Sequence, residues 1–246
     1  YEPEDYSAFT LGDAFIKDND IYVDDYGMYI YYDECAYYMY DDSTADFGDL
    51  NIEDNDIYAA GSEGIYIYYY DTAYYNENDS VANFGDINIT GNDIEAAGDD
   101  GIYLEMYYFG YYLYNSAQVT FGDVNITGSN NIDADDYGIY LYFGDYFGYD
   151  LNNYAEFTAG DVNIQSNVIT ANNNEGIYVF YYDGNYIYDN AQWEVGNLSI
   201  QGNDVTSMNN LGIYAYYSYC GANMYDYSIA RIGNTSISNN GIDAGG

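Results

Sequence analysis

The sequence repeats itself about every 37 residues, and this repeat limits the possible folds more than any other feature. A Gly-Asp or Gly-Asn pair recurs at intervals of 36 to 38 residues, beginning at Gly12, Gly48, Gly85, Gly122, Gly160, Gly196 and Gly233. A Gly-Ile-Tyr or Gly-Met-Tyr motif keeps similar intervals, beginning at Gly27, Gly64, Gly101, Gly138, Gly176 and Gly212. Two independent motifs that share one period indicate equivalent units that stack on their neighbours.

Apolar residues alternate with polar ones inside each repeat. Ile87 and Ile89 flank Asn88, and the same pattern returns after every Gly-Asp or Gly-Asn pair. A period of two with β-branched residues at the inward positions is typical of β-strands, and no helical or heptad spacing is found. The sequence therefore predicts an all-β protein, a parallel β-helix (β-solenoid) of about six and a half 37-residue repeats. The two halves of a repeat differ, which favours one coil per repeat and a rod about 30 Å long.

The predicted solenoid is a single domain over residues 1–246. Residues 1–11 match the tail of a repeat, residues 12–231 hold six full repeats, and residues 232–246 match the head of another. We find no polar cap of the kind that usually ends a solenoid. Open edges invite pairing, so we expect copies to stack head to tail into a filament. The residues expected at the subunit joint are Lys17, Arg231, Ile237 and Ile242.

An asparagine column runs through the repeats. The segment N-I-T-G-N-D-I, followed by G-I-Y-L, resembles the repeats of right-handed parallel β-helices of the pectate-lyase-like and adhesin-like group. In that group an internal asparagine ladder marks a turn. The resemblance implies such a ladder here, in a tyrosine-rich, fibre-forming version of the repeat. Its members would be Asn19, Asn55, Asn92, Asn167, Asn203 and Asn240, with Asn130 shifted by one inserted residue.

Tyrosine is the most unusual component, with 40 residues in 246. One repeat-equivalent column holds Tyr29, Tyr66, Tyr103, Tyr140, Tyr178 and Tyr214. A second, three residues further on, holds Tyr32, Tyr69, Met106, Phe143, Tyr181 and Tyr217. Stacked coils would bring each column together as a ladder worth about 0.5–1.5 kcal/mol per offset ring pair. We expect both ladders to clothe the rod; charge transfer and ligand stacking on exposed rings are the alternatives.

The acidic residues also form columns. One column holds Asp13, Asp49, Asp86, Asp123 and Asp161, and Asn continues it at positions 197 and 234. Like charges one strand apart repel by about 0.9 kcal/mol even in water. Calcium accepts several oxygen ligands in irregular geometry, so these aspartates are the predicted metal ligands and Ca²⁺ the one candidate cofactor. The alternative is a solvated acidic face, and acidic turns also precede the Gly-Ile-Tyr motifs.

Composition excludes several functions. Two cations, Lys17 and Arg231, stand against 42 acidic residues, for a net charge of −40, so we expect no nucleic-acid partner. The chain has no histidine, and its acids recur in every coil without a distinct constellation, so we expect no enzyme. No apolar stretch approaches the roughly 18 residues of a membrane helix. Cys35 and Cys220 stand five coils apart, too far for a disulfide within the chain.

The sequence begins at Tyr1, which favours a secreted, extracellular protein with its leader removed. Asn78, Asn88, Asn125, Asn197 and Asn234 begin Asn-x-Ser/Thr sequons, so glycans are a candidate partner of such a chain. The alternative is that these are outward strand asparagines with β-favouring Thr or Ser nearby. The predicted function is a structural, self-assembling extracellular filament subunit. The alternatives are a calcium-binding adhesin or surface-layer segment, and a carbohydrate-active β-helix enzyme.

Overall fold

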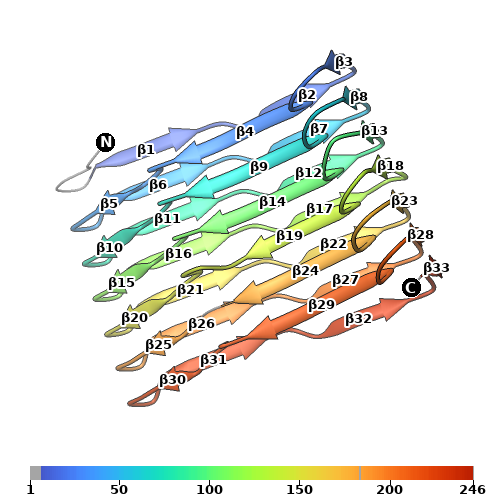
Figure 1. Cartoon of the computed structure of the whole chain (residues 1–246). Coiled ribbons are helices and arrows are strands. Elements are labelled where there is room, and N and C mark those ends of the chain that lie inside the picture. The colour runs from blue at the N-terminus through green and yellow to red at the C-terminus, as the bar shows by residue number, and fades with distance from the viewer. Residues whose placement is uncertain (1–6, 183, 246) are drawn as a thin grey trace.

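The computed structural model describes residues 7–182 and 184–245 as a stack of coils built only from short strands (Figure 1). No helix occurs in these two ranges. Each coil adds one strand to each of five parallel sheets, which we name A to E in chain order. Residues 1–6 of the predicted N-terminal tail lie outside the described residues. The predicted all-β solenoid is confirmed.

The three sheets that open each coil have seven strands each. Sheet A holds β1 (Ala8–Leu11), β6 (Thr44–Phe47), β11 (Val81–Phe84), β16 (Gln118–Phe121), β21 (Glu156–Ala159), β26 (Gln192–Val195) and β31 (Ile229–Ile232). Sheet B holds β2 (Ala14–Lys17), β7 (Leu50–Glu53), β12 (Ile87–Thr90), β17 (Val124–Thr127), β22 (Val162–Gln165), β27 (Leu198–Gln201) and β32 (Thr235–Ser238). Sheet C holds β3 (Asp20–Val23), β8 (Asp56–Ala59), β13 (Asp93–Ala96), β18 (Asn131–Ala134), β23 (Val168–Ala171), β28 (Asp204–Ser207) and β33 (Gly241–Ala244).

The remaining two sheets have six strands each. Sheet D begins at the Gly-Ile-Tyr motif and holds β4 (Met28–Asp33), β9 (Ile65–Tyr70), β14 (Ile102–Tyr107), β19 (Ile139–Phe143), β24 (Ile177–Tyr182) and β29 (Ile213–Ser218). Sheet E is the shortest and holds β5 (Tyr38–Met39), β10 (Tyr75–Glu77), β15 (Tyr112–Tyr114), β20 (Asp150–Asn152), β25 (Tyr186–Ile187) and β30 (Asn223–Met224).

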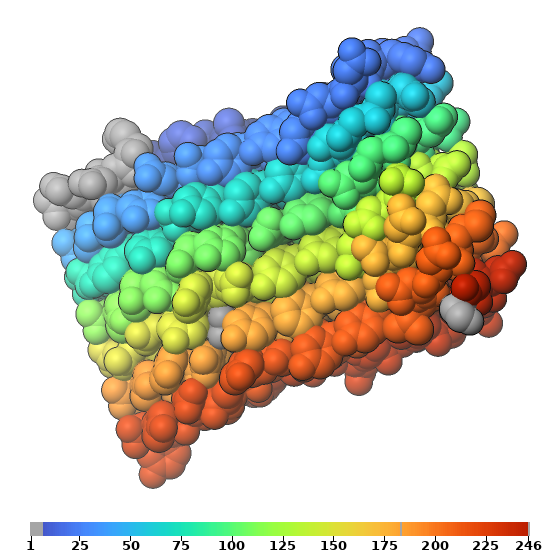
Figure 2. Space-filling model, in the orientation of Figure 1, coloured from blue at the N-terminus to red at the C-terminus, as the bar shows by residue number. Residues whose placement is uncertain are grey.

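Pairing joins equivalent residues of successive repeats. In sheet B, Ile87 lies opposite Leu50 on one side and Val124 on the other, one repeat away in each direction. The same register holds in the other sheets, so one repeat makes one coil, as predicted. Figure 2 shows the coils as parallel bands that cross one face of the molecule. Each band packs directly on the next.

The core lies between sheet D and the opposing sheets A and B, with sheets C and E at the two narrow ends (Figure 1). Tyr69 of sheet D, 3 % exposed, meets Phe84 and Phe121 of sheet A edge to face, at ring-centroid distances of 6.3 and 5.8 Å. The aliphatic pairs that the alternation placed inward, such as Ile87 and Ile89, are fully buried.

One tyrosine prediction is wrong. The column that contains Tyr69, Met106, Phe143 and Tyr181 points into the core, and these four side chains are at most 3 % exposed. The number of residues along the strand explains this: the column stands three residues after the outward Tyr66 column, and an odd step along a strand reverses the face. This ladder therefore fills the solenoid and does not clothe it. Tyr32 and Tyr217, at its two ends, are half-buried and pack against the core.

Candidate functional site

The asparagine ladder follows the corner between sheets B and C. The backbone N–H and the side-chain Nδ2 of Asn55 both donate to Oδ1 of Asn92, at 3.0 and 2.9 Å. Nδ2 of Asn55 also donates to the carbonyl oxygen of Ile16 in the preceding coil. The ladder implied by the resemblance is thus present, running through Asn19, Asn55, Asn92, Asn130, Asn167, Asn203 and Asn240.

Asn130 belongs to the ladder despite its shifted position in the sequence. It donates to Oδ1 of Asn167 at 2.9 Å and is fully buried. The inserted residue is absorbed before it, in the turn through Gly128 and Ser129, which both have positive φ angles. The sequence assigns this rung once one inserted residue is allowed, and the pairing of the following Ile132 with Ile94 confirms the shift.

The aspartate column forms a second ladder, which sequence reasoning missed. Oδ1 of Asp49 accepts the backbone N–H of Asp86 at 2.8 Å, and Oδ1 of Asp86 accepts that of Asp123 at 2.8 Å. The pattern begins at Asp13, passes through Asp161 and continues at Asn197 and Asn234. Each carboxylate is stabilised by a backbone donor, and an amide oxygen serves equally well, which explains why Asn completes the column.

The outward tyrosine ladder on sheet D is continuous over six coils. Neighbouring ring centroids from Tyr29 to Tyr214 are separated by 4.7 to 5.3 Å. The hydroxyl of Tyr103 donates to Glu105 at 3.1 Å, on the same outward face. Burial raises the pKa of both Tyr103 and Glu105, so at neutral pH this tyrosine is a neutral phenol. The ladder packs the sheet, as predicted.

The two ends of the stack expose side chains that are buried in every coil between them. Phe9 and Leu11 at the N-terminal end, which stand in inward columns, are 41 % and 47 % exposed. Ile232, Ile237 and Ile242 at the C-terminal end are 43 %, 47 % and 51 % exposed. Ile237 and Ile242 stand in the inward columns that contain Ile200 and Val205, both fully buried. Each end is therefore an apolar surface with an open strand edge.

The two cations lie on the outermost strands, one at each end. Lys17 on β2 binds Glu53 at 2.9 Å and Asp54 at 3.3 Å in the next coil. Arg231 on β31 binds Glu194 of the preceding coil. Both cations are already paired within the chain, and their role at a subunit joint stays a prediction.

Three carboxylates come together in the turn that leads into sheet D. Oxygens of Asp99, Asp100 and Asp136 lie within 4.8 Å of one another, and no other set of three possible ligands was found in the described ranges. Asp100 is 4 % exposed and accepts the backbone N–H of Tyr137 at 2.9 Å. Burial, rather than neighbouring charge, is the main reason that its pKa rises to about 8. Protonation of Asp100 therefore relieves the repulsion within the turn.

The sequons and cysteines have defined surroundings. All five sequon asparagines use Nδ2 to donate to a neighbouring coil, as Asn125 does to Asn88 at 3.0 Å. Glycan attachment would therefore modify an ordered ladder nitrogen. The thiols of Cys35 and Cys220 donate to the carbonyl oxygens of Asp33 and Ser218, and no disulfide joins them in the described ranges. In the described ranges no helix is long and apolar enough to cross a membrane.

Comparisons with protein-family models, with curated proteins and with solved structures each gave no match. The resemblance to pectate-lyase-like and adhesin-like repeats rests on the solenoid architecture and on the asparagine ladder alone. The particular family is not shown.

Proposed function

We propose that this chain is a structural subunit that stacks end to end with further copies into an extracellular filament. The observation that carries the proposal is that both hydrogen-bonded ladders end on unpaired groups of opposite kind. Such ends complement each other when the C-terminal coil of one copy meets the N-terminal coil of the next.

The asparagine ladder runs in one direction, from each N–H to Oδ1 of the next coil. At the C-terminal end the backbone N–H of Asn240 donates to no residue in the described ranges. At the N-terminal end Oδ1 of Asn19 accepts no hydrogen bond within them, although its Nδ2 and N–H donate to Asn55. A second copy in register would place this acceptor over that donor.

The aspartate column runs the opposite way, and its ends match too. The backbone N–H of Asp13 has no acceptor in the described ranges, while Asn234 presents an unused Oδ1 at the other end. The same register stacks Ile237 on Ile16 and Ile242 on Ile21, which continues the buried aliphatic columns. One register therefore satisfies two ladders and two apolar columns at once.

The joint would have a specific defect. In the described ranges sheets A, B and C have seven strands where sheets D and E have six, so in this register one strand position of sheet D stays open between β29 and β4 of the next copy. The outward tyrosine ladder would be interrupted there. The joint thus depends on three sheets, and a map of the filament should show a weak point on the sheet D side once per subunit.

Electron microscopy of the purified chain tests the proposal. We expect filaments with a layer spacing of about 4.8 Å along the axis, continuous through sheets A to C. Ile242→Asp and Ile237→Asp should abolish them, because each would bury a charge in the joint. Val168→Asp is the matched control, since Val168 is 49 % exposed on the outer face of sheet C in the middle of the stack. Monodisperse monomers at physiological salt, with or without calcium, would contradict the proposal.

Calcium binding is part of the proposal, at the outer carboxylate oxygens of Asp13, Asp49, Asp86, Asp123 and Asp161. Each of these residues uses Oδ1 in the ladder. A calcium-binding adhesin or surface-layer segment is the second candidate, because further coils of a longer chain would cover the same open edges. Thermal denaturation with calcium and with a chelator tests calcium binding separately from filament assembly. A rise in Tm that Asp86→Asn weakens would support calcium, whatever the state of assembly.

A secreted location and the absence of catalysis belong to the same proposal. A tyrosine-clad rod with repeating columns offers the same chemistry in every coil, which suits a material and not a reaction centre. Turnover of a polysaccharide by the purified chain would favour the carbohydrate-active enzyme instead.

A further inference from the structure

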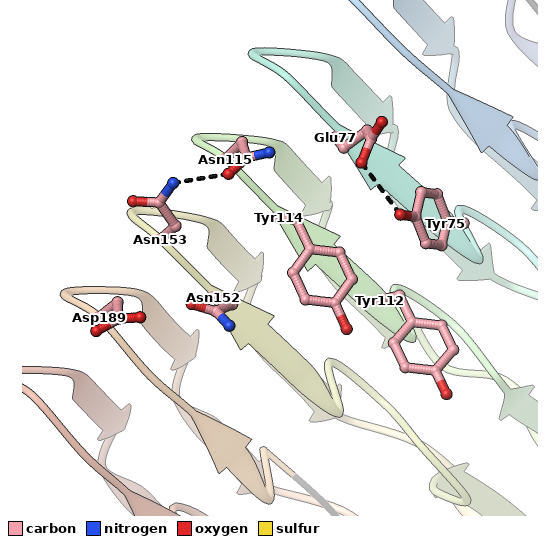
Figure 3. A pocket seen from close by; sticks show the side chains of 8 residues that line it. All are labelled: Tyr75, Glu77, Tyr112, Tyr114, Asn115, Asn152, Asn153 and Asp189. Atoms are coloured by element: carbon pink, nitrogen blue, oxygen red, sulfur yellow. Dashed lines mark hydrogen bonds between the residues drawn. The ribbon is translucent and has the colours of Figure 1, made fainter.

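The outer face of sheet E carries a groove of about 600 Å³ (Figure 3). It is lined by Tyr75, Glu77, Tyr112, Tyr114, Asn115, Asn152, Asn153 and Asp189. These residues come from four successive coils, which hold the middle four strands of sheet E. None of the functions discussed above uses this groove.

The groove exists because two surface columns lose their tyrosines in the same coil. Opposite Tyr112 the next coil has Asp150, and opposite Tyr114 it has Asn152. The shorter side chains leave space beside the two rings. Asp150 also accepts the hydroxyl of Tyr114 at 3.0 Å, which holds that ring in place.

One wall of the groove is aromatic. The rings of Tyr75, Tyr112 and Tyr114 lie with centroids 5.8 to 6.1 Å apart. The hydroxyl of Tyr75 donates to Glu77 at 3.1 Å, and the pKa of Tyr75 is raised to about 12, mainly by burial. The ring therefore stays neutral and keeps the electron-rich face that attracts cations.

The other wall presents acceptors. Asn115, Asn153 and Asp189 occupy one corner position in successive coils, with φ angles of 54°, 53° and 49°, a conformation that Asn and Asp tolerate. Nδ2 of Asn153 donates to Asn115 at 2.6 Å, and Nδ2 of Asn115 donates to Asn78 at 3.0 Å. Oδ1 of Asn115 accepts the Asn153 amide, so Oδ1 of Asn153 and the carboxylate of Asp189 are the acceptors that this column leaves unused in the described ranges. The carboxylate of Asp189 accepts no hydrogen bond in the described ranges.

Charge decides the class of ligand. Glu77 and Asp189 lie three coils apart, about 14 Å at the strand spacing of a parallel sheet. No cation lines the groove, since Lys17 and Arg231 are bound by carboxylates at the two ends of the stack. An anion is repelled here, and a neutral sugar would find few free donors. An extended chain with an ammonium group at each end matches both the acceptors and the rings.

We propose that this groove binds a linear aliphatic polyamine. Its terminal ammonium groups contact Glu77 and Asp189, and its methylene stem lies across the rings of Tyr112 and Tyr114. This proposal is independent of filament formation, because the groove lies on coils that the joints do not touch.

Calorimetric titration with spermine tests the proposal. We expect one saturable site per chain, with putrescine binding more weakly because it is too short to reach both carboxylates. Tyr112→Leu should weaken spermine binding about tenfold, while Tyr112→Phe, which keeps the ring, should change it little. Glu77→Gln should also weaken it about tenfold.

Asp204→Asn is the charge-matched control. Asp204 is exposed on sheet C, at the opposite narrow end of the coil, so its loss should leave affinity unchanged within about a factor of two. Equal weakening by Glu77→Gln and Asp204→Asn would show diffuse attraction to the acidic surface and overturn the proposal. Binding of a neutral glucose oligosaccharide that depends on Tyr112, without binding of spermine, would overturn it as well.

Discussion

The backbone N–H and the side-chain Nδ2 of Asn203 both donate to Oδ1 of Asn240, at 2.9 and 3.0 Å. A single amide oxygen therefore joins two coils through two hydrogen bonds, and this unit recurs along the ladder. The coils are held together at this corner by polar contacts as well as by the apolar core.

Replacing a central ladder residue should destabilise the fold strongly. Asn92→Ala removes the acceptor of two Asn55 donors and the donor to the carbonyl of Ile52, all in a buried corner. Buried groups left unpaired cost about 1–3 kcal/mol each, so we expect the free energy of unfolding to fall by about 3 kcal/mol. Urea denaturation followed by the fluorescence of Trp193, the single tryptophan, measures this.

Asn88→Ala is the matched control for the ladder. Asn88 is half-buried on the outer face of sheet B, where its Nδ2 donates to Asn51. Water replaces that partner, so the loss should stay below about 1 kcal/mol. Equal losses of stability in Asn92→Ala and Asn88→Ala would show that burial of the ladder does not determine its contribution to stability.

Adding a methyl group at the start of a sheet D strand should be costly. A Cβ at Gly101 would stand 2.2 Å from Cγ2 of Ile132 and 2.6 Å from the carbonyl oxygen of Gly138 in the next coil. We expect Gly101→Ala to lower the free energy of unfolding by about 1–3 kcal/mol. A Cβ at Gly12 meets nothing within 4 Å, so Gly12→Ala should be neutral or slightly stabilising in the same thermal or urea unfolding assay.

Replacing one buried polar residue, Asn76, should stabilise the fold. Asn76 lies fully buried in a column that has Met39 on one side and Leu113 on the other. Its Nδ2 donates to the carbonyl of Ala73, but its Oδ1 has no partner among the described residues. Asn76→Leu removes an unsatisfied acceptor and should raise the free energy of unfolding by about 1 kcal/mol. A decrease in Tm would instead show that the bond to Ala73 outweighs the orphaned oxygen.

The acidic turn should make stability depend on pH. Asp100 has a folded-state pKa of about 8, above its ordinary value, because burial disfavours its charge. The folded chain therefore holds a proton that the unfolded chain has lost, and the stability from this group, complete below about pH 4, falls as pH rises towards 8. We expect this decline in the free energy of unfolding to exceed about 1.4 kcal/mol, the value of one pKa unit. It should be absent in Asp100→Asn.

Asp204→Asn again serves as the control, because it removes one exposed charge and leaves the turn unchanged. Urea unfolding of the three proteins at several pH values from about 4 to 9 gives the comparison. Parallel pH profiles for all three would mean that Asp100 is ionised in the folded chain at neutral pH, contrary to this expectation.

The period and the alternation predicted much of this structure because stacking repeats one environment many times. Equivalent residues such as Tyr66 and Tyr103 must lie one above the other once each repeat makes one coil, so the columns could be found by counting. The counting had to allow one inserted residue before Asn130, and it failed where the face reverses, at Tyr69. Counting also described the Asp86 column only as a row of repelling carboxylates. A count of charges does not show that each Oδ1 accepts a backbone N–H of the next coil.

The sequence by itself determined the repeat, the parallel strands and the asparagine and tyrosine columns, since a period shared by independent motifs leaves few ways to bury the same residues in every coil. Only the tertiary structure decided which way each ladder runs, which groups its ends leave unpaired, and where two missing tyrosines open a groove on sheet E. Those properties depend on the direction of individual donors and on side chains from different coils meeting in space. The pattern along a single repeat shows neither the direction of a hydrogen bond nor a contact between side chains of different coils.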